Sequence, residues 1–210
     1  MNNVFKDIDA YYTGKIRKYG AIPKGVDWND EESQFIRFEQ LSKVIKDSNF
    51  SINDIGCGYG VYSKYLDSLG FDNFNYTGYD LSREMIHNAN KMYGKSNISN
   101  PTFSKIKSLK EVTKSDYSVA SGIFNVKMKF SNAEWLSYIL DTLENINEKS
   151  KKGFSFNMLT KYSDKELMRG DLYYADPLFF FDYCKRNYSK EISLLHDYDL
   201  YEFTILVKKV

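Results

Sequence analysis

The sequence lacks the features of a disulfide-rich, metal-binding or membrane protein. It has only two cysteines, Cys57 and Cys184, and neither stands at metal-ligand spacing from another cysteine or histidine. No apolar run approaches the roughly 20 residues of a membrane helix, and the N-terminus lacks the apolar core of a signal peptide. We therefore expect no metal, no membrane and a cytoplasmic location.

An excess of charge of one sign is also absent. Lys and Arg number 29 and Asp and Glu number 28, which leaves a formal net charge of +1. The net charge therefore gives no long-range electrostatic attraction for nucleic acid, and we expect no nucleic-acid partner. With only three prolines and no low-complexity tract, the 210 residues predict a single domain. Its helical lead-in covers 1–48 and its α/β sheet core covers 49–210, as a monomer or a homodimer.

The most informative stretch that is present is glycine-rich. An apolar strand pattern ends near Asp54. A loop containing Gly56, Gly58 and Gly60 follows it, and a helical pattern begins directly after the loop. Alternating glycines allow a tight turn and the close approach of a ligand, and a helix N-terminus offers free N–H groups. The third glycine falls one residue earlier than in the dinucleotide fingerprint. The pattern indicates a nucleoside-binding loop, with a dinucleotide as the weaker alternative.

After this loop the pattern alternates between strand and helix, as a parallel α/β sheet requires. A capping box at Ser131 and Glu134 and the pair Asp176-Pro177 each predict a helix start, and Ser163 with Glu166 predicts a short helix. Four residues separate the last two strands, which predicts an antiparallel hairpin. The expected strands are 50–55, 75–79, 102–106, 117–120, 153–159, 191–196 and 201–207.

This order of elements, together with Asp54-x-Gly56-x-Gly58-x-Gly60, resembles the class I S-adenosylmethionine-dependent methyltransferases over nearly the whole chain. That family has a Rossmann-like fold whose seven-stranded, mostly parallel sheet ends in an antiparallel hairpin. The resemblance implies S-adenosylmethionine as the cofactor, with its methionine part at the glycine turn. The residues implied to bind it are Asp54, Gly56, Cys57, Gly58, Gly60, Asp80, Leu81, Ser82, Ser121, Gly122 and Arg37.

Asp80 is the second part of the resemblance. It ends the second predicted strand, 24 residues after Gly56, where the family places an acid that accepts both ribose hydroxyls. The alternative role for Asp80 or Ser82 is to cap the next helix. The family often has an acid after the third strand for the adenine amino group, and none is present here. Ser104, Ser108 or the backbone are the remaining candidates.

The acceptor site is expected after the fourth and fifth strands. The candidate substrate-binding residues are Trp28, Asn125, Tyr173, Tyr174 and Asp176. His196 ends the sixth strand, and its ordinary pKa near 6.5 suits a general base; a hairpin histidine bonded to a neighbour is an equal alternative.

The expected reaction is methyl transfer to a hydroxyl or amine of a small molecule, such as a sugar, an amino acid or a carrier-linked intermediate. The Asn/Asp-Pro-Pro-Tyr/Phe motif that marks enzymes acting on nucleic-acid bases is absent after the fourth strand. Two alternatives stay open. One is a methyltransferase acting on protein or RNA, and the other is a cofactor-binding but catalytically idle partner subunit.

Overall fold

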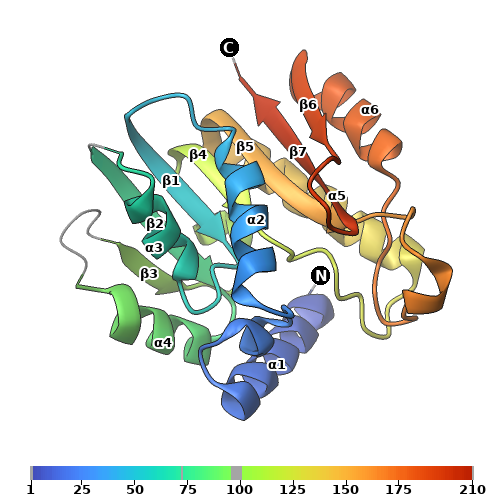
Figure 1. The fold of residues 1–210 in the computed structure, drawn as a ribbon, viewed down its shortest axis with the longest axis horizontal. Helices are drawn as coiled ribbons and strands as arrows, with labels where there is room; N and C mark the ends of the chain where they lie inside the picture. The colour runs from blue at the N-terminus through green and yellow to red at the C-terminus, as the bar shows by residue number, and fades with distance from the viewer. Residues whose placement is uncertain (1, 72, 96–100, 210) are drawn as a thin grey trace.

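A seven-stranded sheet with the strand order β3-β2-β1-β4-β5-β7-β6 runs through the protein (Figure 1). The computed structural model describes residues 2–71, 73–95 and 101–209. The strands are β1 (Asn49–Ile55), β2 (Asn73–Asp80), β3 (Thr102–Lys105), β4 (Ser115–Ala120), β5 (Ser150–Leu159), β6 (Glu191–Leu195) and β7 (Glu202–Lys208). The α-helices are α1 (Asn2–Tyr19), α2 (Glu31–Ser42), α3 (Val61–Ser68), α4 (Arg83–Tyr93), α5 (Asn132–Lys149) and α6 (Pro177–Asn187). Short 3-10 helices are η1 (Pro23–Val26), η2 (Leu109–Glu111) and η3 (Lys165–Leu167).

The first five strands are parallel, and β7 is antiparallel to both of its neighbours, β5 and β6. The chain winds outward from β1 to β3 and then returns to place β4 on the other side of β1. Connections on the two sides of this point diverge, which opens a crevice at the carboxyl ends of β1 and β4. The predicted Rossmann-like fold with its terminal hairpin is confirmed.

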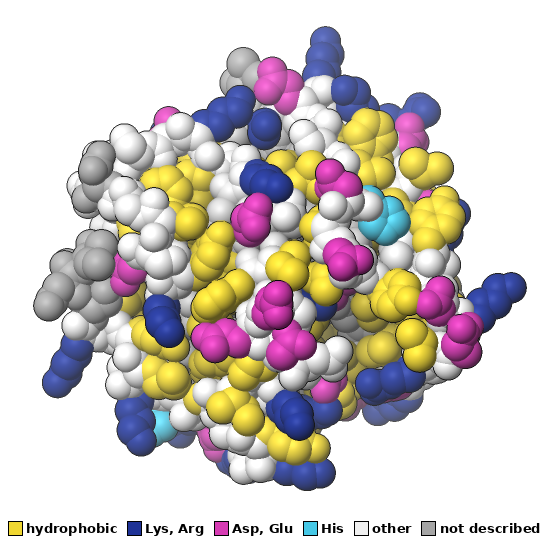
Figure 2. Space-filling view, in the orientation of Figure 1, with side chains coloured by type: hydrophobic (Ala, Val, Ile, Leu, Met, Phe, Trp, Pro, Cys, Tyr) yellow, Lys and Arg dark blue, Asp and Glu magenta, His cyan; other side chains and the backbone are white. Residues whose placement is uncertain are grey.

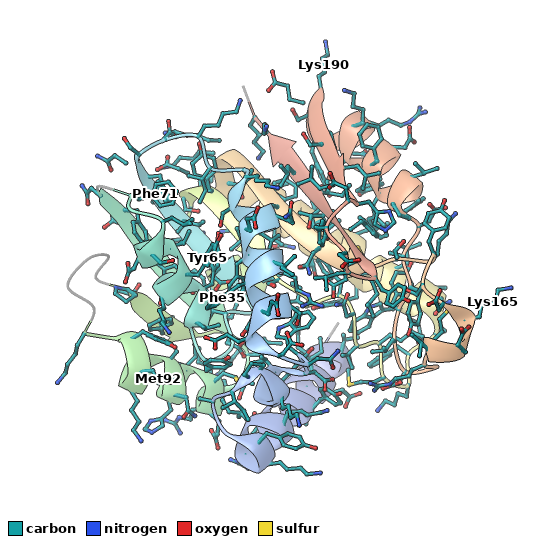
Figure 3. The ribbon with its side chains drawn as sticks, viewed as in Figure 1. Phe35, Tyr65, Phe71, Met92, Lys165 and Lys190 are labelled. Atoms are coloured by element: carbon teal, nitrogen blue, oxygen red, sulfur yellow. The ribbon has the colours of Figure 1, made fainter. Side chains whose placement is uncertain are left out.

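Helices cover both faces of the sheet. Helices α2, α3 and α4 bury side chains such as Phe38, Leu66 and Ala89 against one face, and Figure 3 shows Phe35 and Tyr65 meeting between α2 and α3. Helices α5 and α6 pack on the other face. The sheet therefore lies between two apolar layers.

Local sequence signals place several helix ends where they were predicted. Ser131 and Glu134 form a complete capping box on α5, and the Asp176 side chain accepts from the Leu178 N–H at the start of α6. The short helix predicted from Ser163 and Glu166 is present as η3, which contains Glu166. Its N-cap is Asp164 rather than Ser163, because the Ser163 hydroxyl donates to the Thr160 carbonyl. Helix α2 ends at Ser42.

Helix α1 lies across the carboxyl edge of the sheet, on the side of α4 (Figure 1). The Thr13 hydroxyl lies 2.6 Å from that of Ser82, just after β2, and the Asp9 carboxylate lies 3.5 Å from the Lys105 amine, at the end of β3. The lead-in therefore packs on the loops that follow the strands. Within the described ranges, no helix combines the length and apolar character needed to cross a membrane.

Candidate functional site

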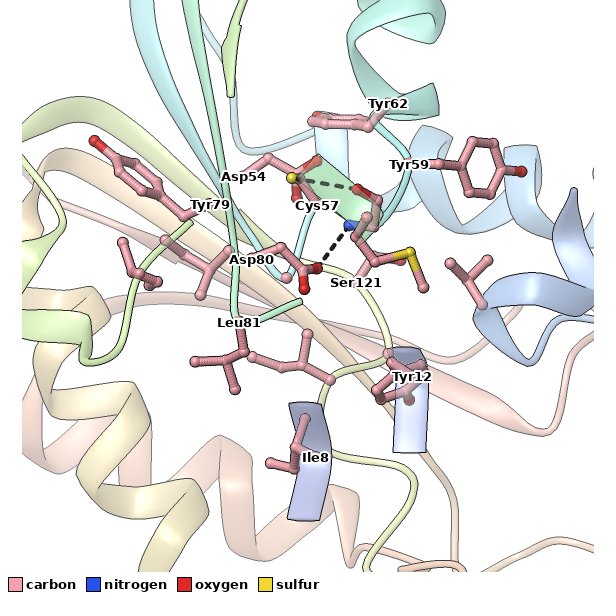
Figure 4. A pocket seen from close by; sticks show the side chains of 18 of the residues that line it. Ile8, Tyr12, Asp54, Cys57, Tyr59, Tyr62, Tyr79, Asp80, Leu81 and Ser121 are labelled. Carbon is pink, nitrogen blue, oxygen red and sulfur yellow. Dashed lines mark hydrogen bonds between the residues drawn. The ribbon is translucent and has the colours of Figure 1, made fainter. Parts of the chain in front are cut away.

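A cavity lies at the carboxyl ends of β1, β2 and β4, and α1 and η1 cover it (Figure 4). Its walls come from elements that are far apart in the sequence. The lining residues are Phe5, Ile8, Asp9, Tyr12, Val26, Trp28, Gln34, Phe38, Asp54, Ile55, Gly56, Cys57, Gly58, Tyr59, Val61, Tyr62, Tyr79, Asp80, Leu81, Met85, Ile106, Leu109, Ser121, Gly122, Ile123, Tyr138 and Thr142.

The glycine turn after β1 forms one wall. Gly56, Gly58 and Gly60 all have positive φ, which side-chain-bearing residues rarely adopt. A Cβ on Gly58 would lie 2.9 Å from the Val26 side chain, so the missing side chain lets η1 approach the turn. Gly60 is the N-cap of α3 and does not line the cavity. Its missing side chain leaves room for the ring of Phe103.

Asp80 presents a partly buried carboxylate to the cavity. Its Oδ2 accepts from the Gly58 N–H over 3.0 Å, and its Oδ1 accepts from the Ser82 N–H over 2.8 Å. Burial raises the pKa of Asp80 to about 6, and these backbone donors partly oppose the rise. Each oxygen has a second lone pair, so the carboxylate keeps capacity to accept from a ligand's hydroxyls. Ser82 itself caps α4 and does not line the cavity.

Two further carboxylates line the cavity. Burial raises the pKa of Asp54 to about 7, although the Tyr76 hydroxyl donates to its Oδ2 over 2.6 Å. Asp9 contributes the third carboxylate from α1. None of the described lining residues is a lysine or an arginine. The electrostatics of the cavity therefore favour a ligand that carries positive charge.

Two hydroxyls that line the cavity make no hydrogen bond within the described part of the chain. Ser121 Oγ is buried at the end of β4 without a partner. The Tyr12 side chain enters from α1, across the cavity from Asp80 (Figure 4). Buried polar atoms without partners are rare, and Ser121 Oγ therefore marks a place where a ligand could supply the missing hydrogen bond. Tyr12 is only partly buried. A cation that carries hydroxyl and amine donors fits this cavity.

Nine of the predicted residues meet in this cavity, while Arg37 and Asn125 do not line it. Arg37 is buried in an ion pair with Glu202, with Nε 3.0 Å from the carboxylate. Asn125 donates to Glu202 and accepts from the Leu159 N–H. Their roles toward cofactor and acceptor stay predictions. The nine that line it are Trp28, Asp54, Gly56, Cys57, Gly58, Asp80, Leu81, Ser121 and Gly122.

The aromatic segment after β5 has mainly structural contacts. Tyr173 belongs to the core, and its N–H donates to the Asn125 carbonyl. The Tyr174 hydroxyl accepts from the Arg169 N–H, and Asp176 pairs with Lys161 while capping α6. Their predicted contact with an acceptor stays untested.

His196 is exposed just after β6, beside the rings of Tyr162 and Phe203. Strand β6 is the outermost strand, three places from β4. Because neighbouring strands are about 4.8 Å apart, that separation is roughly 14 Å. His196 also does not line the cavity. Its role as a general base stays a prediction, and this position argues against it.

Sequence reasoning missed the part of the cavity supplied by helices. Phe5, Ile8 and Tyr12 lie on one face of α1, and Tyr138 and Thr142 come from α5. The helical spacing of the α1 residues indicates an apolar helix face. Nothing in the sequence indicates which part of the fold that face packs against. Adenine recognition also lacks an obvious side chain, because Ser108 caps η2 and Leu81, Ile106 and Leu109 supply apolar walls.

Comparisons with known proteins agree with this geometry. A family model described as a methyltransferase domain matches residues 52–146. Rv1506c of Mycobacterium tuberculosis, which is named as a methyltransferase, is 53% identical over 161 residues, covering 76% of this chain and 93% of that protein.

Two solved structures share the fold. Magnesium protoporphyrin IX methyltransferase from Synechocystis PCC 6803, with bound SAH, has a TM-score of 0.62 at 15% identity and covers 98% of each chain. Human N-acetylserotonin methyltransferase, in complex with SAM, has a TM-score of 0.68 at 14% identity, covering 98% of this chain and 59% of that one.

Proposed function

The chain belongs to the class I S-adenosylmethionine-dependent methyltransferases, and we propose that it methylates a hydroxyl or an amine of a small molecule. A sugar, an amino acid or a carrier-linked intermediate is the acceptor class we propose. The observation that carries the proposal is the acidic cavity at the ends of β1, β2 and β4, which α1 covers.

The cavity residues fit the cofactor of this family, S-adenosylmethionine. We propose that Asp80 accepts its ribose hydroxyls and that the turn around Gly58 accommodates its methionine part. Leu81 and Ile106 would flank the adenine. The bound cofactor supplies an electrophilic methyl group on a positively charged sulfur. The cavity lining favours this positive charge, because it contains three carboxylates and, among the described residues, no lysine or arginine.

The chain's own contribution to the reaction is alignment and the exclusion of water. Methyl transfer is an in-line displacement, so the acceptor atom must be held close to the methyl group and opposite the sulfur. The aromatic rings of Phe5 and Tyr12 from α1, with that of Trp28, line the cavity, and we propose that they keep water from this region. The unpaired Ser121 hydroxyl is the polar group that we propose orients a donor of the cofactor or acceptor.

Electrostatics support a small molecule over RNA as the acceptor. On the face shown in Figure 2, acidic side chains gather near the middle, while lysine and arginine lie mainly toward the rim. An RNA-binding surface instead needs a contiguous basic stripe along the phosphates. The formal net charge of +1 gives no further attraction.

Labelled-methyl transfer tests this proposal. The purified protein is incubated with methyl-labelled S-adenosylmethionine and a fractionated metabolite extract, and the labelled product is identified. We expect label in a low-molecular-weight hydroxyl or amine compound, and much less label with an Asp80→Ala protein at a low cofactor concentration. Label that appears only in protein or RNA from the same lysate would contradict the small-molecule proposal.

A further inference from the structure

The carboxylate of Glu202, at the start of β7, is buried outside the cavity. Its side chain is 1 % exposed and that of its ionic partner Arg37 is 9 % exposed. Asn157 Nδ2 donates to the oxygen that Arg37 binds, and Asn125 Nδ2 donates to the other oxygen over 3.4 Å. A buried ion pair adds little net stability, because desolvation offsets its attraction. Its presence here therefore points to a positional role.

Arg37 extends this contact to Trp28. The guanidinium carbon lies 3.9 Å from the centroid of the indole, which is stacking distance for a cation–π contact. Arg37 Nη1 also donates to the Ser33 carbonyl over 2.6 Å. The guanidinium plane is thus fixed by α2 and by Glu202 while it supports the indole. Trp28 itself lines the cavity.

The edge of the same indole packs against Gly122, which lies just after β4. Its φ is +69°, and a Cβ at this position would collide with the six-membered ring of Trp28. The Gly122 N–H donates to Asn157 Oδ1 over 2.8 Å. The contacts therefore close a ring that runs from Glu202 through Arg37, Trp28, Gly122 and Asn157 and back to Glu202.

We propose that Glu202 positions Trp28 as a wall of the methyl-transfer site, through Arg37 on one side and through Asn157 and Gly122 on the other. The inference rests on the proposed function, because Trp28 and Gly122 line the cavity in which we propose that methyl transfer takes place. Glu202 does not line the cavity and is a positioning residue. Trp28 is the residue that an acceptor would meet.

Tryptophan fluorescence tests this proposal, because Trp28 and Trp135 are the only two tryptophans in the chain. The Trp28 signal is the emission of each protein minus that of its Trp28→Phe counterpart. Glu202→Gln keeps the size of the side chain but removes its charge. The new amide NH2 group would also face the N–H donors of Arg37, Asn157 and Asn125. We expect the Trp28 emission to shift to the red and its acrylamide quenching constant to rise.

Glu191→Gln is the matched control, because Glu191 lies on β6 with its side chain 51% exposed. This variant is expected to leave the Trp28 signal unchanged. Arg37→Lys is the second variant, since lysine keeps the charge opposite Glu202 but has no planar group to stack on the indole. Arg37→Lys should also increase the exposure of Trp28. If Glu202→Gln does not fold, the Trp28 signal of Arg37→Lys is the test of the proposal. An unchanged Trp28 signal in the folded variant overturns the proposal.

Titration with S-adenosylmethionine separates this inference from the proposed function. Calorimetry records cofactor binding, and the Trp28 signal of the wild-type protein is followed in parallel. We expect binding to lower the quenching of Trp28. Binding without any change in Trp28 overturns the assignment of the indole to the site. A response of Trp28 to Glu202→Gln in a protein that binds no cofactor supports the positioning and overturns the proposed function.

Discussion

The hydroxyl of Thr13 on α1 lies 2.6 Å from the hydroxyl of Ser82, two residues beyond Asp80. Ser82 caps α4, and its own N–H donates to the Asp80 carboxylate. The helix that covers the cavity is therefore bonded directly to the segment that we propose holds the ribose. This relationship joins the lead-in to the cofactor site, and it makes α1 part of that site.

Removing this bond should speed the exchange of cofactor. Thr13→Val keeps the shape of the side chain but loses the hydroxyl, and a hydrogen bond of this kind contributes about 1 kcal/mol. We expect S-adenosylmethionine to dissociate several-fold faster in stopped-flow measurements. Arg17→Ala, which removes an exposed ion pair between α1 and Glu84, is the control and should change the rate little. Equal rates in wild type and Thr13→Val would mean that α1 does not limit exchange.

Gly122 should tolerate no side chain. Gly122→Ala forces a positive φ on alanine and drives Cβ into the indole of Trp28, so we expect a loss of roughly 1–3 kcal/mol in the free energy of unfolding. Gly170→Ala is the matched control, because its φ is ordinary and no heavy atom lies within 4 Å of the added Cβ. Denaturant unfolding measures both variants. A stability of Gly122→Ala equal to wild type would contradict the packing of Trp28 on this turn.

The buried carboxylates should make cofactor binding depend on pH. Burial raises the pKa of Asp80 to about 6 and that of Asp54 to about 7, from an ordinary value of 3.8. A positively charged ligand favours the ionised carboxylates, so affinity for S-adenosylmethionine should rise from pH 5 to pH 8 and binding should release protons. Calorimetry in two buffers of different ionisation enthalpy measures this release. A flat affinity with no proton release would refute the charge argument.

The same two groups affect the stability of the protein without ligand. Their pKa values are higher in the folded than in the unfolded chain, so the folded state holds more protons between about pH 4 and pH 7. Stability contributed by the neutral carboxyls is therefore present at low pH and is lost as pH rises through this window. Asp54→Asn should flatten the dependence, which denaturant unfolding at several pH values checks.

His196→Ala should leave methyl transfer largely unchanged. The side chain is exposed just after the edge strand β6 and does not line the cavity, so we expect it to lie too far from the reacting atoms to act on them. Turnover of the acceptor identified by labelled-methyl transfer is the measurement, with cofactor affinity as the control. Loss of turnover with unchanged affinity would restore the sequence-based prediction that His196 is the base.

Local signals in the sequence were sufficient for much of the fold. The capping box of Ser131 and Glu134 spans four residues, and Asp176-Pro177 spans two, so short-range chemistry decides both helix starts. The glycine turn and Asp80 were predictable for a related reason, because each lies where a strand ends. The short helix near Ser163 was also predictable, but it is capped by Asp164, because the Ser163 hydroxyl donates to the Thr160 carbonyl instead.

Long-range contacts in the site could not be predicted from one sequence. Arg37 and Glu202 are 165 residues apart, and only the crossing of α2 over β7 brings them together. Phe5, Ile8 and Tyr12 recur at helical spacing, but this spacing does not indicate that the helix covers a cavity. Such pairings depend on how the layers pack, a property that local patterns do not encode.

The most direct test of the central claim is the equilibrium affinity for S-adenosylmethionine, measured by calorimetry for wild type and Asp80→Ala. A lost hydrogen bond to a charged group costs about 1.5–3 kcal/mol, so we expect Asp80→Ala to bind roughly 10- to 100-fold more weakly. Asp182→Ala, on the exposed face of α6, is the control and should bind like wild type. An affinity of folded Asp80→Ala equal to that of wild type would contradict the account.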